Sequence, residues 1–240
     1  MPVKQSDMTK RELMPKRNSE FTIEGVSSRS SARFDYVVSP LDFRDYSKCL
    51  IRLGYQLLQP LPPELPLGPM SIGLAASGPI ARKDIFLADI NTERQFIGIS
   101  GGDSPSNSDR LHEILETLVS DGLVSREKIH FRELQTRYRI LTRQASNAMR
   151  ESCKNAPLLK LAAKSFGKDM ALFTARLIAA DSKIDSPDYF EIYIEPSIAR
   201  PESEMGMSIV FRNQDVKVFQ HFVATCDERI ESLVRGLLKK

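Results

Sequence analysis

The order of the predicted elements constrains this chain more than any other feature. A strand, a helix, three strands and a helix follow one another, and the same series then occurs a second time. The first series begins with RFDYVV at Arg33–Val38, and the second begins with TRYRIL at Thr136–Leu141. Their last helices also match, as HEILETLV at His112–Val119 and DERIESLV at Asp227–Val234. We therefore predict a tandem pseudo-duplicated α+β fold, with an antiparallel sheet and helices packed on one of its faces.

Smaller correspondences support the same interpretation. The alignment places Tyr36 opposite Tyr138, and it places Cys49 and Cys153 in matching helices. The alternative is a coincidental use of common α+β elements, because amphipathic helices share Glu and Leu at similar spacing. We expect strands at Phe34–Val38, Met70–Ala76, Ile85–Ile90, Gln95–Ser100, Phe131–Leu141, Met170–Ala179, Tyr189–Glu195 and Met207–Arg212.

The helix pattern and the polar N-terminus set the predicted domain organisation. Apolar spacing predicts helices that include Phe43–Leu57, Asp109–Leu123 and Val216–Leu238, with Ser106 and Asp109 as a capping box. A further helix begins near Ala145 and is interrupted at Pro157. Residues 1–33 are predicted to be a flexible N-terminal arm that holds at most a short edge strand. Residues 34–125 form the first repeat, residues 126–240 form the second, and the two pack as one compact unit.

Composition favours a soluble cytoplasmic protein without a membrane partner. With 240 residues, of which 41% are hydrophobic, the chain can bury a substantial core. It contains no run of eighteen apolar residues and no apolar signal core at its N-terminus. Three widely spaced cysteines indicate buried thiols in a reducing compartment rather than a disulfide framework.

Charge is distributed unevenly although the net charge is only +3. Residues 126–168 hold eleven basic and three acidic side chains, a net charge of +8. The segments 1–33, 34–125 and 169–240 carry +3, −5 and −3. A focused positive charge attracts phosphates, so one hypothesis is a non-enzymatic protein that binds nucleic acid. Its contact residues would be Arg126, Lys128, Arg132, Arg137, Arg139, Arg143, Arg150, Lys154, Lys160 and Lys164.

The alternative function is protein assembly, either with a second copy or with another protein. Strand alternation places Tyr189 and Tyr193 on the sheet face opposite Phe190, Ile192 and Ile194. Tyrosine tolerates partial exposure and is common at interfaces, so these two side chains are the candidate contacts. In this interpretation the charged segment is an ordinary solvated face.

No catalytic, metal or cofactor site is predicted. The histidines are scattered, and no cysteine has a second ligand at metal-binding spacing. A metal-dependent nuclease is a remote alternative, because Pro187–Asp188 and Asp215–Lys217 have the residue types of the PD-(D/E)xK signature. The lysine element begins a predicted helix, which fits that signature poorly. The glycine-rich GISGGDSPSNSDR matches no phosphate-binding fingerprint and indicates a capped turn.

Two resemblances follow from these motifs. The repeated element order resembles that of the TATA-box-binding protein family, which implies a saddle-like architecture, although its phenylalanine wedges have no counterparts here. The segments HFRELQTRYRILTR, YFEIYIEP and ERIESLVRGLL are similar to those of a sporadically distributed prokaryotic family of uncharacterised proteins. That resemblance implies a prokaryotic origin and a duplicated α+β fold, and it implies no catalytic residues.

Overall fold

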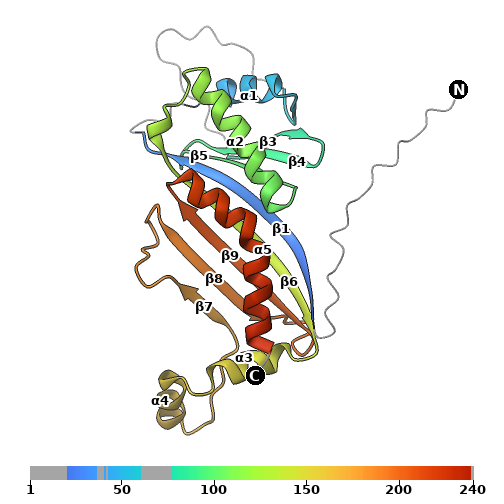
Figure 1. The fold of residues 1–240 in the computed structure, drawn as a ribbon, viewed down its shortest axis with the longest axis vertical. Helices are drawn as coiled ribbons and strands as arrows, with labels where there is room; N and C mark the ends of the chain where they lie inside the picture. Colours follow the sequence, from blue (N-terminus) through green and yellow to red (C-terminus); the bar gives the residue numbers. More distant parts are fainter. Residues whose placement is uncertain (1–20, 37–40, 42, 61–76, 239–240) are drawn as a thin grey trace, which may run out of the picture.

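The structure is a computed structural model that describes residues 21–36, 41, 43–60 and 77–238 of the chain. Figure 1 shows helices lying over a long twisted sheet. The first part of the chain contributes five strands and two helices. These are β1 (Phe21–Phe34), α1 (Phe43–Arg52), β2 (Gln56–Leu57), β3 (Ser77–Lys83), β4 (Phe86–Asn91), β5 (Phe96–Ser100) and α2 (Ser104–Ser120).

The second part begins with a 3₁₀ turn, η1 (Arg126–Lys128), that leads directly into the next long strand. Pro157 separates two short helices, as the sequence predicted, because proline is tolerated only in the first turn of a helix. The elements are β6 (Ile129–Thr142), α3 (Ala145–Cys153), α4 (Pro157–Phe166), β7 (Ala175–Ile178), β8 (Tyr189–Pro196), β9 (Glu204–Asn213) and α5 (Val216–Leu238).

The described strands form one antiparallel sheet in the order β2-β3-β4-β5-β1-β6-β9-β8-β7. The α+β class and the antiparallel sheet with helices on one face are thereby confirmed. The strands β1 and β6 form the central pair. Next to β1 lie β5, β4, β3 and β2, and next to β6 lie β9, β8 and β7, so the chain order runs inward toward the centre on both sides. The two sides are similar but not identical, because β2 has no counterpart beyond β7 and α4 has none in the first part. A duplication as the origin of this similarity stays a prediction.

The central position of β1 corrects the prediction of an N-terminal arm. Residues 21–33 were assigned to a flexible arm, but they form almost all of β1, which pairs with both β5 and β6. Residues 1–20 lie outside the described residues. The alignment of Tyr36 with Tyr138 is also wrong, because Tyr36 follows the end of β1 whereas Tyr138 lies inside β6.

Other boundaries shift by smaller amounts. The strand expected at Met70–Ala76 lies outside the described residues, and the strand that precedes β4 is Ser77–Lys83. The helix α2 begins five residues earlier than predicted, because Asp103 rather than Ser106 caps it. The strand expected at Met170–Ala179 is limited to β7. The prediction for α5 agrees with its observed bounds.

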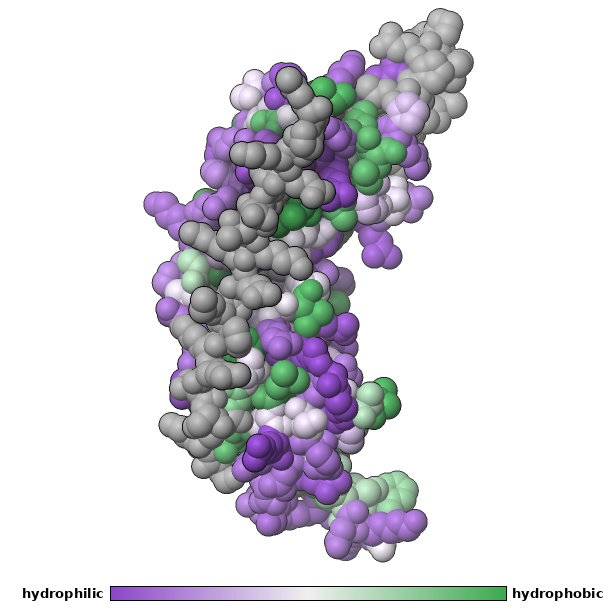
Figure 2. All heavy atoms as spheres, turned by 90° about the vertical axis from the view of Figure 1, so that its right-hand side faces the viewer, coloured by the Kyte–Doolittle hydropathy of each residue, from purple (hydrophilic) through white to green (hydrophobic). Residues whose placement is uncertain are grey.

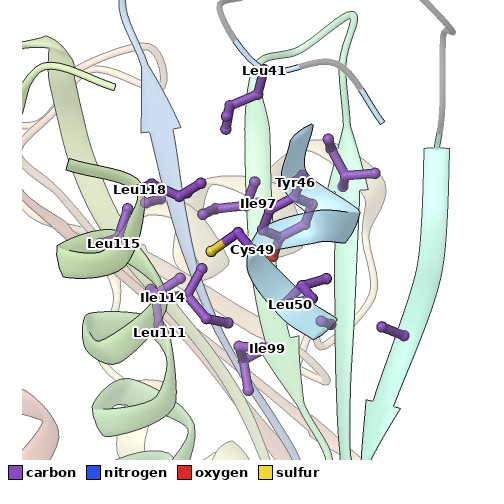
Figure 3. Packing of buried hydrophobic residues seen from close by; sticks show 14 of the residues in the cluster. Leu41, Tyr46, Cys49, Leu50, Ile97, Ile99, Leu111, Ile114, Leu115 and Leu118 are labelled. Carbon is purple, nitrogen blue, oxygen red and sulfur yellow. The ribbon is translucent and has the colours of Figure 1, made fainter. Parts of the chain in front are cut away.

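The first core lies between the sheet and the helices α1 and α2. Figure 3 shows Tyr46 and Leu50 of α1 beside the β5 side chains, with Leu111 and Leu115 of α2 nearby. Cys49 is a free thiol that is fully buried in this cluster, as predicted. One amphipathic stripe on each helix, at intervals of three and four residues, is enough to cover this end of the sheet.

The second core repeats this arrangement under α5. Phe219, Phe222 and Cys226 pack against Met205, Met207 and Ile209 of β9 and against β6. The buried positions of α2 and α5 follow the same spacing at their N-terminal ends. These positions are Ser104, Asn107, Ser108 and Leu111 in α2 and Phe219, Phe222, Val223 and Cys226 in α5.

A charged pair bridges three strands on the opposite, uncovered face of the sheet. Arg29 of β1 donates hydrogen bonds to Asp89 of β4 at 2.6 and 3.0 Å, although β5 lies between these strands. The guanidinium reaches across Gly98 of β5, where an added Cβ would approach it to 2.5 Å. Because Gly98 has no side chain, the guanidinium of Arg29 can cross β5 and reach Asp89.

We expect Gly98→Ala to lower the free energy of unfolding by about 1–2 kcal/mol, because the methyl group displaces a charge-assisted pair that is only partly exposed. Urea unfolding measures this change. The matched control is Gly206→Ala in β9, whose added Cβ would meet Glu195 at an ordinary 3.8 Å. An equal effect of Gly98→Ala in the Asp89→Asn background would contradict the proposed role of the pair.

Candidate functional site

The predicted basic residues are divided between the two faces of the sheet. Arg132 points to the helix side and is 8% exposed, and burial lowers its pKa while Glu116 opposes that shift. Arg137 and Arg139 have the opposite parity in β6 and lie on the uncovered face. Arg137 and Arg139 therefore share one sheet face. Arg143 follows the end of the strand.

Several of these cations have acidic partners from distant parts of the chain. Arg139 forms ion pairs with Glu24 at 3.4 Å and with Glu204 at 3.1 Å. Arg126 binds both carboxylate oxygens of Glu116 at 2.9 and 2.5 Å. Lys128 lies over the ring of Tyr36, and Lys154 pairs with Glu151 at 3.4 Å. The +8 segment is therefore partly neutralised where it joins the body of the protein.

Arg137 is exposed within β6, and the other four members lie toward the end of the molecule formed by α3 and α4. Arg143 is exposed just before the short helix α3, Arg150 is exposed on α3, and Lys160 and Lys164 are exposed on α4. The structure thus divides the ten predicted contacts. Arg132 is buried, and Arg126 and Arg139 form ion pairs at the sheet. The four exposed cations at the α3–α4 end of the molecule are Arg143, Arg150, Lys160 and Lys164.

The two candidate interface tyrosines lie on the uncovered face, on the side opposite Ile194, as predicted. Tyr189 is buried, because the guanidinium of Arg212 lies 5.0 Å from its ring centre. Tyr193 is half-buried and donates a hydrogen bond to Glu195 at 3.0 Å. This face also holds the Arg212–Glu133 ion pair. Its charged side chains are largely matched within the fold.

Exposed apolar side chains are concentrated instead along residues 157–178. No residue of α4 is buried, and Leu158, Leu161 and Phe166 are 73%, 62% and 71% exposed. Leu177 and Ile178 of β7 are exposed as well. Figure 1 places α4 at the lower end of the molecule, and Figure 2 shows green and purple atoms side by side at that end. This segment was predicted only as a basic one. The apolar spacing in PLLKLAAKSF was the signal for it.

A cleft of about 600 Å³ opens on the helix side of the sheet, where α2 and α5 pass over β1 and β6. Its floor includes Gly25, Val26 and Ser27, where a bulge interrupts the β1–β6 register. Asp227 of α5 lines the opposite wall and accepts a hydrogen bond from Tyr138 at 2.7 Å. Nothing in the local sequence predicted this cleft, because its walls come together only through the sheet order.

The glycine-rich loop closes one end of the cleft and is a capped turn, as predicted. Gly101 has φ +107°, and an added Cβ there would lie 1.9 Å from the carbonyl oxygen of Ile85. Asp103 accepts a hydrogen bond from the amide of Ser106, and Asn107 accepts one from the amide of Gly102. These amides are already engaged, which leaves the start of α2 unsuited to a phosphate.

The residues of the nuclease-like pattern and a buried thiol are the candidates for a metal or nucleophilic site in the described part of the chain. No three His, Cys, Asp or Glu side chains there are arranged to hold a metal ion. Asp215, which belongs to the nuclease-like pattern, caps α5 through the amides of Lys217 and Val218. Cys226 is a buried free thiol, and burial raises its pKa to about 11, which suits an inert thiol.

Comparisons with protein-family models, with curated proteins and with solved structures find no match for this chain. The resemblances drawn from its motifs therefore stay predictions. Among the described helices, none combines the length and the apolar character that crossing a membrane requires.

The buried phenol of Tyr138 makes the free energy of unfolding depend on pH in the alkaline range. Burial raises its pKa above the usual value, so the folded state holds the phenol proton more tightly than the unfolded state does. This stabilisation is complete below about pH 10 and is lost as the pH rises further. Tyr46 and Tyr55 act in the same direction, since burial raises both of their pKa values.

We therefore expect Tyr138→Phe to lose less stability than the wild type between about pH 9 and about pH 11. At neutral pH the variant should be less stable by about 0.5–1 kcal/mol, because it lacks the hydrogen bond to Asp227. Urea unfolding over a pH series measures both effects. Parallel pH profiles for the two proteins would contradict the role assigned to this hydroxyl.

Proposed function

We propose that this protein is a protein-assembly module that associates with a second copy of itself through α4 and the edge strand β7, which follows α4 in the chain. The observation that carries this proposal is the exposure of Leu158, Leu161 and Phe166 on a helix without a buried residue. A helix of this length has little stability in water unless its apolar side is covered. A partner surface would provide that cover.

The angular arrangement on α4 supports the proposal. At about 100° per residue, Leu158, Leu161 and Phe166 fall on one broad side of the helix. Lys160 and Lys164 fall on the other side. An apolar stripe beside a basic one is typical of a helix that lies against another surface, with its charges at the rim.

The neighbouring strand supports association with a second copy in particular. Within the described sheet, β7 has a hydrogen-bonding partner on one side only, which is β8. An unprotected edge strand can pair with the same strand of another copy about a twofold axis. The exposed side chains of Leu177 on one sheet face and Ile178 on the other would add apolar contacts to such a strand pairing.

Sedimentation over a range of protein concentrations tests this function. We expect Leu158→Gln/Leu161→Gln to raise the dimer dissociation constant at least about tenfold, because buried anchors carry most of the energy of an interface. The control Lys160→Gln/Lys164→Gln changes the other side of the same helix and should have a small effect. Tyr193→Ala tests the uncovered sheet face instead. A monomer at every concentration would refute self-association.

Nucleic-acid binding is the second candidate function, favoured by the exposed cations Arg143, Arg150, Lys160 and Lys164 at one end of the molecule. Phosphates would displace bound ions from such a surface, so the affinity would fall steeply with salt concentration. This candidate uses the basic side of α4, whereas self-association uses its apolar side.

Anisotropy titrations with a labelled duplex over a salt series separate the two candidates. If nucleic acid binds here, Lys160→Gln/Lys164→Gln should weaken binding and reduce the salt slope by about 2, and Leu158→Gln/Leu161→Gln should not. Arg126→Ala is a matched control, because Glu116 already neutralises that guanidinium. Binding that is independent of salt concentration would exclude this function.

A further inference from the structure

The cleft between α2 and α5 is a second surface, and it is independent of the proposed assembly. It lies at the junction of the two halves, over the bulge in β1, and its volume of about 600 Å³ falls in the range of small-molecule sites. Its lining is shared by β1, β6, α5 and the loop before α2. The fold therefore assembles this cavity from four separate segments.

The charges in the cleft are of one sign. Among the described residues that line it, every charged side chain is acidic: Asp103, Asp227, Glu228 and Glu231. Two of these carboxylates are already used, because Asp103 caps α2 and Glu231 pairs with Arg235 at 2.5 Å. Asp227 and Glu228, in the middle of α5, remain to face a ligand.

One of these carboxylates is held in position from inside the protein. Tyr138 is 5% exposed, and its hydroxyl donates a hydrogen bond of 2.7 Å to Oδ1 of Asp227. Burial keeps the phenol protonated by raising its pKa, so it acts as a permanent donor. The second oxygen of Asp227 stays free to accept a bond from a ligand. A fixed carboxylate loses less entropy on binding than a mobile one.

The other walls define the remainder of the ligand. Phe21, Ile23 and Val26 give the cleft an apolar side. Ser28 and Ser104 share a hydrogen bond of 2.9 Å, and each hydroxyl keeps further bonding capacity. Anions are disfavoured by the carboxylates and by the engaged amides of Gly102 and Ser106. A metal ion is disfavoured too, because no three His, Cys, Asp or Glu side chains among the described residues are arranged to hold one.

We propose that this cleft binds an organic cation, in which an ammonium or guanidinium group is carried on a short apolar stem. The charged group pairs with Asp227 and Glu228, and the stem lies against Ile23 and Val26, because the ring of Phe21 already faces the guanidinium of Arg235 at 5.5 Å. Such a group occurs on a free amine and also on a lysine or arginine side chain. Both sources share this chemistry.

Isothermal titration with agmatine tests the proposal on the full chain, with butylurea as the uncharged control and butylguanidine as the ligand that differs from butylurea in the guanidinium charge alone. Agmatine and butylguanidine should bind, and butylurea should bind at least about tenfold more weakly, since charge-assisted hydrogen bonds are about twice as strong as neutral ones. Added salt should weaken the binding of agmatine. Equal binding of butylguanidine and butylurea, or the absence of agmatine binding to every form of the protein, would overturn the proposal.

Variants locate the binding within the protein. Asp227→Asn/Glu228→Gln should weaken agmatine binding at least about tenfold. The asparagine still accepts the bond from Tyr138, so the fold is preserved, and unchanged urea unfolding verifies this. Asp109→Asn removes one exposed charge from α2 outside the cleft and is the matched control. An equal loss of affinity in this control would overturn the assignment to the cleft.

A final comparison identifies the source of the cation. N-acetylarginine amide represents an arginine side chain in a peptide, and its binding can be compared with that of agmatine. The chain's own first twenty residues are a third source, tested by the Lys16→Gln/Arg17→Gln variant. Agmatine binding that strengthens in this variant supports an internal competitor for the same site. The basic residues that precede Phe21 are Lys4, Lys10, Arg11, Lys16 and Arg17.

Discussion

The antiparallel pairing of β1 with β6 is the constraint on which the rest of this structure depends. These two strands run side by side from Phe21 opposite Thr142 to Phe34 opposite Ile129, and they join two groups of strands into one sheet. Their register fixes which side chains meet the helices, because side chains alternate between faces. The bulge at Val26 then shifts that alternation by one residue in β1 alone.

This shift explains why the sequence predicts the second half better than the first. In β6, β8, β9 and α5 the apolar period is regular, and the predicted segments coincide with the observed ones. In β1 the helix-facing residues are Phe21 and Ile23 before the bulge and Ser28, Ser30 and Ala32 after it. Small polar residues and a change of parity hide a central strand from any test of periodicity, so the sequence pattern predicts an arm there.

Long-range pairing likewise decides what the charged segment can do. A count of charge along residues 126–168 predicts one cationic surface, but it ignores acids that are distant in sequence. Glu24 and Glu204 reach Arg139 from the strands on either side of β6, and parity sends Arg132 into the helix layer. Sequence could indicate the residue types of a candidate site. It could not show which of them remain available, because that depends on strand order.

The same geometry separates rigid from adaptable surfaces. The cleft lies over the central strands, where β1 and β6 are each paired on both sides and α2 contacts α5. A site there is preorganised by the whole sheet, which suits the recognition of a small charged group. Helix α4 and strand β7 lie at the periphery, where β8 alone pairs with β7 and α4 buries none of its residues. Stability in proteins declines toward such poorly covered elements, so they can rearrange against a partner without disturbing the core. One sheet thereby carries a fixed cavity at its centre and exposed apolar side chains at its edge.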